Sequence, residues 1–287
     1  MSQNFEPVAS CQGQAGGVIA RDGHILFCAV DESRILDFDP DSGAVSEFRR
    51  YTSRISGLAP GPSGRIYAAQ SGSRRVVQLN PDGSVSTLSS RLGGRVHNHP
   101  FDLTVDGSGR IWFSDPYSAI PAQGPQVFER LGHASVLRLR QLPNRHWTMD
   151  RMTTDTSFPG AVQVSADSST LFVTENDPDP QGRRELRAYP IFADGNLGRP
   201  AVLHTFGSDH RGPHRGGYGL CLDAGGRLLL CAGSTESGPG PAVYIFGLDG
   251  HISGTLALPE NPAACCCLGS EIYVTTVGGR LLRADAG

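Results

Sequence analysis

The chain contains no lysine, so all 25 of its basic residues are arginines. This absence excludes a Schiff base on a lysine amine of the protein from the possible mechanisms. No apolar run approaches the ~20 residues that a membrane-spanning helix needs. The N-terminus also lacks the basic and apolar regions of an export signal. We therefore expect a cytoplasmic protein without a membrane partner.

The seven cysteines follow no spacing that is typical of a disulfide framework or a zinc site. Three of them are consecutive, at 265–267, and Cys28, Cys221 and Cys231 lie inside apolar runs, where a free thiol packs as a small hydrophobic group. The net charge is −3 and the basic residues form no cluster. This charge pattern argues against nucleic acid as a partner.

A turn led by Gly or Ser, followed by a short apolar strand, recurs six times along the chain. A unit that repeats every 40 to 60 residues, with strand and turn signals and no helical pattern, predicts a β-propeller. The six copies of this motif are residues 22–27, 63–68, 108–113, 168–173, 225–230 and 269–274.

Each motif is expected to be the second strand of a four-stranded blade, and an apolar run upstream is expected to be the innermost strand. The prediction is an all-β, six-bladed propeller that forms a single domain over residues 1–287. Too few residues follow 279–283 for the last strand of the sixth blade. We expect the N-terminal segment to supply that strand and close the ring. The predicted blades are residues 10–50, 51–95, 96–155, 156–206, 207–258, and 259–287 with 1–9.

Several motifs resemble, in order and over nearly the whole chain, the SMP-30/gluconolactonase/LRE-like family. They include Ala-Gly-Gly-Val-Ile (15–19), Asn-His-Pro-Phe-Asp-Leu (98–103), Ile-Trp-Phe-Ser-Asp-Pro (111–116) and Leu-Phe-Val-Thr-Glu-Asn (171–176). The resemblance implies a six-bladed propeller, with one divalent cation, often calcium, at the mouth of the central channel. Members hydrolyse lactones or phosphotriester-like esters, whereas the related strictosidine synthases carry out a metal-free condensation on a similar scaffold.

The residue just before each innermost strand should lie at the same height around the channel. The distance along the sequence from this residue to the first apolar residue of the second strand is 10, 10, 10, 11, 10 and 7 residues in the six blades. Five of the six distances agree within one residue, which indicates equivalent positions. These six channel positions are Ala15, Ser56, Phe101, Gly160, Tyr218 and Cys265.

The resemblance implies that four of these positions hold the cation through a Glu, two Asn and an Asp. This chain has Ala15, Phe101, Gly160 and Tyr218 there. None of these residues supplies a carboxylate, although a hard cation needs roughly six oxygen ligands. We therefore expect a divergent member without the usual calcium ligands, and no cofactor.

Histidines in two loops at the channel mouth leave a different metal possible. His97 and His99 lie in the loop that enters the third blade, and His214 lies in the loop that enters the fifth. Imidazoles suit zinc or a transition metal, but solvated loop histidines would show the same spacing.

Tyr218 either donates a proton or fills space beside Phe101.

Two acidic residues at the ends of second strands, Asp115 and Glu175, are expected to face the channel. Apolar neighbours would raise the pKa of such a carboxyl group toward a range useful for acid–base catalysis. Alternatively, Asp115 caps a turn and Glu175 pairs with a loop arginine. Cys265 is either a nucleophile beside a histidine or an inert buried thiol.

The sequence predicts a metal-independent enzyme that hydrolyses, eliminates from or cyclises an apolar or aromatic small molecule, such as a secondary metabolite. The alternatives are a metal-dependent lactonase or esterase with a relocated histidine site, and a non-catalytic ligand-binding propeller. The oligomeric state stays open. The candidate catalytic residues are Tyr218, His99, His97, His214, Glu175 and Asp115. The candidate substrate-binding residues are Ala15, Ser56, Phe101, Phe158, Gly160 and Cys265.

Overall fold

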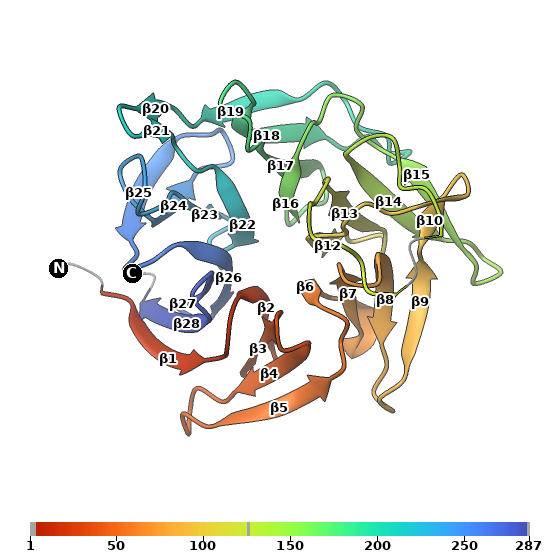
Figure 1. The fold of residues 1–287 in the computed structure, drawn as a ribbon, viewed down its shortest axis with the longest axis horizontal. Coiled ribbons are helices and arrows are strands. Elements are labelled where there is room, and N and C mark those ends of the chain that lie inside the picture. Colours follow the sequence, from red (N-terminus) through yellow and green to blue (C-terminus); the bar gives the residue numbers. More distant parts are fainter. Residues whose placement is uncertain (1–3, 125–126, 286–287) are drawn as a thin grey trace.

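The computed structural model describes residues 4–124 and 127–285. Six antiparallel four-stranded sheets are arranged like blades around a common centre (Figure 1). In each of the first five blades, strands that follow one another in the sequence pair with one another. The predicted all-β, six-bladed propeller is therefore confirmed.

Each blade extends from an innermost strand at the hub to an outermost strand at the rim. In that order, the first three blades contain β2 (Ala15–Arg21), β3 (His24–Ala29), β4 (Arg34–Phe38) and β5 (Val45–Arg50); β6 (Ile55–Pro60), β7 (Ile66–Gln70), β8 (Arg75–Leu79) and β9 (Val85–Ser89); and β12 (Leu103–Val105), β13 (Ile111–Asp115), β14 (Ser135–Gln141) and β15 (Trp147–Arg151). The last three contain β16 (Pro159–Val164), β17 (Thr170–Asn176), β18 (Arg184–Pro190) and β19 (Ala201–Thr205); β22 (Gly217–Leu222), β23 (Leu228–Ala232), β24 (Ala242–Phe246) and β25 (Ile252–Ala257); and β26 (Pro262–Leu268), β27 (Glu271–Thr276), β28 (Arg280–Asp285) and β1 (Glu6–Ser10).

The N-terminal strand closes the ring, as predicted. β1 pairs antiparallel with β28, so the first and last strands of the described chain lie side by side in the sixth blade (Figure 1). Arg283 donates to Glu6 across this pair at 2.6 Å, and Phe5 packs into the core between the fifth and sixth blades. The pairing covers the free edge of β28, which would otherwise expose unpaired backbone groups.

The apolar core lies between neighbouring blades. One buried cluster contains Ile19 and Leu26 from the first blade together with Leu58 and Ile66 from the second. Further clusters join other neighbouring pairs of blades, including the fifth with the sixth. Alternation along each strand directs these side chains to both faces of a blade.

Glycines allow the innermost strands to approach each other at the hub. A Cβ atom at Gly57 of β6 would lie 2.7 Å from the carbonyl oxygen of Phe101. A Cβ atom at Gly219 of β22 would lie 2.5 Å from the Cα of Ala264 in β26. Side chains do not fit at these distances, so the glycines set how close the blades can be at the centre.

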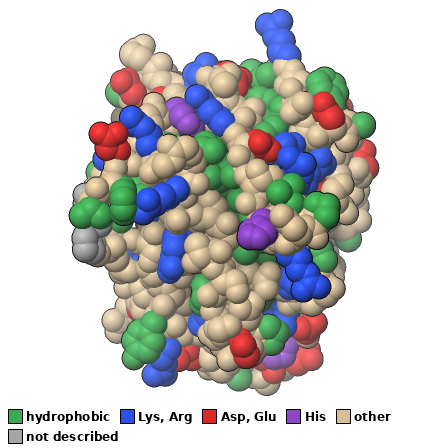
Figure 2. Space-filling model, turned by 90° about the vertical axis from the view of Figure 1, so that its right-hand side faces the viewer, with side chains coloured by type: hydrophobic (Ala, Val, Ile, Leu, Met, Phe, Trp, Pro, Cys, Tyr) green, Lys and Arg blue, Asp and Glu red, His purple; other side chains and the backbone are tan. Residues whose placement is uncertain are grey.

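Two short hairpins and one turn complete the described structure. β10 (Arg91–Leu92) pairs with β11 (Arg95–Val96) before the third blade, and β20 (Ser208–Asp209) pairs with β21 (Gly212–Pro213) before the fifth. The 3₁₀ turn η1 covers Pro62–Gly64. The described residues include no helix long and apolar enough to cross a membrane. On the face shown in Figure 2, basic and acidic side chains are interspersed with small apolar groups.

Candidate active site

Strand pairing shows which residues of the innermost strands are equivalent. In each blade, the first apolar residue of the second strand pairs with a residue of the innermost strand. The channel position is four residues before that paired residue. In the second to fifth blades this position is Ser56, Phe101, Gly160 and Tyr218, as predicted. The same count gives Gly16 and Ala263 in the first and sixth blades.

The predicted positions of Ala15 and Cys265 are therefore wrong, by one and two residues. β26 already begins at Pro262, and a tight turn between Leu268 and Glu271 joins it to β27. The apolar run at 266–268 is thus the end of the strand rather than its start. Cys265 lies in the wall of a different cavity, and Ala15 is fully buried in the core.

A cavity of about 200 Å³, which we call the mouth pocket, lies at the end of the hub where the innermost strands begin. It brings together six of the predicted site residues: Ser56, His99, Phe101, Phe158, Gly160 and Tyr218. The remaining described residues that line it are Gln14, Val30, Arg54, Ser71, Pro116, Tyr117, Ser118, Ile120 and Asn176.

His99 is the only histidine among the described residues that line the mouth pocket. Burial, and then the positive charges of Arg54 and Arg74, lower its pKa to about 4. Its imidazole is therefore neutral at pH 7 and can accept a proton.

Asp115 holds the loop that carries His99. Its carboxylate accepts hydrogen bonds from the backbone N–H groups of Asn98 at 2.9 Å and His99 at 2.7 Å. Burial raises the pKa of Asp115 to about 7, while these two amides lower it. Asp115 was predicted to face the channel, but it is 1 % exposed and faces the loop backbone. The alternative, a residue that caps a turn, describes its contacts better.

Glu175 has the same arrangement one blade further on. Its carboxylate accepts hydrogen bonds from the backbone of Ser157 at 3.2 Å and of Phe158 at 3.0 Å, and from the Ser157 hydroxyl at 3.1 Å. Burial raises its pKa. Glu175 is fully buried and does not line the mouth pocket, so the prediction that it faces the channel is also wrong. Both acids position loops of the pocket wall.

Arg54 supplies the one charged side chain in the described lining of the mouth pocket. Its backbone has a φ of 54°, and Tyr51 and Ser53 just before it have φ values of 57° and 54°. Such left-handed conformations are costly for residues other than glycine and often occur at functional sites. The guanidinium forms an ion pair with Asp31 at 2.9 Å, and within the described part of the chain its buried Nε has no hydrogen-bond partner.

Aromatic rings form much of the remaining wall. Phe101 and Tyr218 meet edge to face, with their ring centroids 6.5 Å apart. The guanidinium of Arg215 lies 3.9 Å from the ring centroid of Tyr218. Tyr117 and Ile120 line the pocket from the loop after β13.

The sequence prediction missed Arg54, Tyr117 and Ile120 because it took one residue per blade at the start of each inner strand. Arg54 lies two residues before Ser56, so side-chain alternation could have indicated it. Tyr117 and Ile120 lie in an irregular loop outside the repeat, where no pattern in the sequence marked them.

The other two predicted histidines do not line the mouth pocket. His97 is fully buried, its Nε2 lies 2.9 Å from the Ser89 hydroxyl, and burial lowers its pKa to about 4. His214 lies 3.8 Å from Asp209, at the second short hairpin. The loops that carry these histidines were predicted correctly, but their rings face local partners.

The lining of the mouth pocket does not fit a calcium ion. A hard cation needs several oxygen ligands, with carboxylates prominent among them, and none of the described lining residues is an Asp or a Glu. The side-chain oxygen of Asn176 already accepts the N–H of Gly216 at 3.0 Å. Over residues 4–124 and 127–285, no group of three or more His, Cys, Asp or Glu side chains is placed to hold a metal ion.

The fold and the pocket define a six-bladed propeller with a candidate binding site at one end of its hub. The family model for the SMP-30/gluconolactonase/LRE-like region matches residues 13–278, so the chain belongs to this family. The resemblance inferred from the motifs is confirmed.

Two of the similar proteins are gluconolactonases. One, from Zymomonas mobilis, is 24 % identical over 291 residues, which cover 94 % of this chain and 77 % of the relative. The structure of another, from Xanthomonas campestris, is 25 % identical with a TM-score of 0.81, covering 99 % of this chain and 89 % of that one. The calcium-binding protein regucalcin from Agrobacterium tumefaciens shares the fold at 16 % identity, with a TM-score of 0.72 and coverage of 99 % and 96 %.

Proposed function

We propose that this protein hydrolyses small lactones in the mouth pocket without a metal ion, with His99 as the general base. The observation that carries the proposal is a neutral imidazole in the pocket lining, next to the positive charge of Arg54. Lactone hydrolysis is also the activity named for two relatives, the gluconolactonases of Zymomonas mobilis and Xanthomonas campestris.

His99 activates the attacking water. Its low pKa keeps the ring unprotonated at neutral pH. The water gives a proton to this imidazole while the water oxygen bonds to the carbonyl carbon of the lactone. Asp115 fixes the ring in the pocket through the backbone of the loop.

Arg54 stabilises the charge that develops on the carbonyl oxygen. Its guanidinium is close enough to His99 to lower the pKa of the imidazole. A fixed positive charge in a poorly hydrated pocket stabilises an oxyanion more strongly than it would in water. When the ring C–O bond breaks, the released alkoxide takes the proton back from His99, and the product is a hydroxy acid.

The pocket favours a compact ring with an apolar face. Phe101, Phe158, Tyr117 and Tyr218 supply aromatic surface, and the volume is about 200 Å³. This volume is below the range of about 300–1,000 Å³ that is typical of sites for drug-sized ligands. We therefore propose a monocyclic lactone with an apolar or aromatic substituent rather than a large polycyclic metabolite.

Replacement of the histidine tests the proposal. His99→Gln should lower kcat for a small lactone by about 100-fold, because the general base is lost, with little change in KM or in the thermal midpoint. His146→Gln is the matched control, because His146 is exposed on the turn between β14 and β15. Equal activity of His99→Gln and wild type on every lactone that the wild type hydrolyses would refute the role of His99.

A relocated metal site is less consistent with the side chains present. That alternative needs His97 or His214 to join His99, but these two rings face Ser89 and Asp209 instead. We therefore propose no metal-dependent mechanism.

A further inference from the structure

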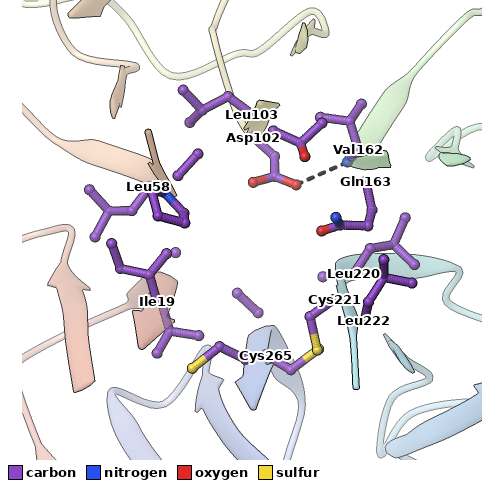
Figure 3. A pocket seen from close by; sticks show the side chains of 18 of the residues that line it. Ile19, Leu58, Asp102, Leu103, Val162, Gln163, Leu220, Cys221, Leu222 and Cys265 are labelled. Carbon is purple, nitrogen blue, oxygen red and sulfur yellow. Dashed lines mark hydrogen bonds between the residues drawn. The ribbon is translucent and has the colours of Figure 1, made fainter. Parts of the chain in front are cut away.

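A second cavity, of about 310 Å³, lies at the other end of the hub. All six innermost strands contribute to its lining, in which apolar side chains alternate with exposed polar groups (Figure 3). Asp102 lies on one side of it and accepts the N–H of Val162 at 2.9 Å. Cys221 and Cys265 lie on the opposite side in the view of Figure 3.

The thiols in this wall are close together. The Sγ of Cys221 lies 3.4 Å from the Sγ of Cys265 and 4.0 Å from the Sγ of Cys267. Cys221 belongs to β22 of the fifth blade, and Cys265 belongs to β26 of the sixth. The close approach of these strands at Gly219 and Ala264 brings their backbones together, as a disulfide requires.

We propose that Cys221 and Cys265 form a redox-sensitive pair, which a peroxide oxidises to a disulfide that links the fifth and sixth blades at the hub. The pair is separate from the mouth pocket, so this inference does not depend on the proposed hydrolysis.

The chemistry assigns a different role to each sulfur. S–H groups of Cys221 and Cys231 lower the pKa of Cys265 below the usual value for a thiol, whereas the same cluster raises the pKa of Cys221. The Cys265 thiolate attacks a peroxide oxygen and becomes a sulfenic acid, while the O–O bond breaks and the other oxygen leaves as hydroxide. The Cys221 thiol then attacks the Cys265 sulfur and displaces water. Both sulfurs are oxidised, and one hydrogen peroxide is reduced to two waters.

The packing of Cys266 and the absence of a metal-binding group among the described residues argue against two other roles for these thiols. Cys266 lies between Cys265 and Cys267 in the sequence but packs in the cluster of Phe27 and Tyr273. The described residues hold no group of three metal-ligating side chains that could bind an ion, which argues against a soft-metal site in this wall. The cavity provides a path by which a small oxidant reaches the Cys265 sulfur.

Peptide mapping tests the proposal directly, because the chain has no lysine and trypsin therefore cuts only after arginine. Residues 216–227 form a tryptic peptide with Cys221 as its single cysteine, and residues 228–280 form another with Cys231 and Cys265–267. After the folded, reduced protein is treated with hydrogen peroxide and its remaining thiols are alkylated, the two peptides should be recovered joined. Their combined mass should be lower by two hydrogen atoms, and fragmentation should place the link at Cys265.

Variants identify the partner. Cys265→Ser should abolish the link, whereas Cys266→Ser, the matched control, should retain it. The wild-type measurement needs no variant, so a folding defect in Cys265→Ser would leave the test decisive. Recovery of the 216–227 peptide unlinked, or linked to Cys231 or Cys267, would overturn the proposal.

Discussion

His97 and His99 are two residues apart, but their rings have different environments. The ring of His97 is enclosed and lies next to Ser89, whereas the ring of His99 lines the mouth pocket beside Arg54. Burial lowers the pKa of both to about 4. Contact with the cavity, rather than a perturbed pKa alone, therefore distinguishes a candidate base from a buried structural histidine.

The pH profile of activity should show the low pKa of His99. Because this pKa is about 4, the imidazole stays neutral down to about pH 5, and protonation at lower pH removes the base. Protonation of Asp115, whose pKa is about 7, weakens its hold on the loop and should lower kcat/KM for a lactone only in part. Protonation of His99 should abolish the remaining activity with a pKa of about 4. Circular dichroism at each pH controls for unfolding. Loss of all activity in a single step near pH 6.5, the value of an ordinary histidine, would contradict this expectation.

Asp115→Asn should disturb both stability and catalysis. An asparagine can accept only one of the two backbone N–H groups with its oxygen and turns an NH₂ group toward the other. We expect the free energy of unfolding to fall by about 2–3 kcal/mol, and kcat to fall about tenfold because His99 shifts. Urea denaturation and steady-state kinetics measure the two effects.

Glu175→Gln is the matched variant, since Glu175 holds Ser157 and Phe158 in the same way. It should cost similar stability but raise KM rather than lower kcat, because Phe158 lines the pocket without being the base. If both variants changed kcat and KM in the same proportions, Asp115 would have no specific effect on His99.

A side chain does not fit at Gly160 without a shift of its neighbours. A Cβ atom would lie 2.6 Å from the Thr174 hydroxyl, which accepts the N–H of Ala161. Gly160→Ala should lower the free energy of unfolding by about 2 kcal/mol. Gly132→Ala is the control, because a Cβ atom there meets no described atom within 4 Å, and it should change stability by no more than about 0.5 kcal/mol. Equal effects of the two substitutions in urea denaturation would show that the contact with Thr174 costs nothing.

At the scale of single residues, the sequence correctly predicted the channel positions in those blades whose first two strands pair in the same way. Ser56, Phe101, Gly160 and Tyr218 follow from the repeat because the second to fifth blades pair their first two strands alike. It could not predict where Asp115 points, because backbone amides of a loop compete with the channel for the carboxylate.

Among the elements, β1 shows how the sequence predicts topology. The short sixth blade implied that the N-terminus supplies a strand, and β1 pairs with β28 as expected. β26 shows the limit of the same reasoning. Only two residues separate β26 from β27, so the apolar run before this turn is the end of β26 and does not show where the strand begins.

Removal of residues 1–10 should destabilise the whole propeller rather than a tail. The deletion removes the buried ring of Phe5 and leaves β28 as an open edge. We expect the free energy of unfolding to fall by about 5 kcal/mol or more, a large share of the stability of a typical domain. Glu6→Gln, which breaks only the exposed pair with Arg283, should cost no more than about 1 kcal/mol. If the deletion variant had the same urea midpoint as the wild type, the pairing of β1 with β28 would contribute nothing to the free energy of unfolding.

At the scale of the whole molecule, the two ends of the hub differ in chemistry. The mouth pocket has a neutral histidine, an arginine and aromatic rings, whereas the opposite cavity has a half-buried carboxyl group and neighbouring thiols. Only β6, β16 and β22 among the innermost strands contribute residues to the described lining of both cavities.

The most direct test of metal-independent hydrolysis is the rate of lactone hydrolysis by the chelator-treated protein, with bound metal measured in the same sample. We expect the metal-free wild type to hydrolyse a small lactone as fast as the untreated protein. His99→Gln in the same assay should be about 100-fold slower. Loss of activity on chelation that added calcium restores would contradict the proposed mechanism.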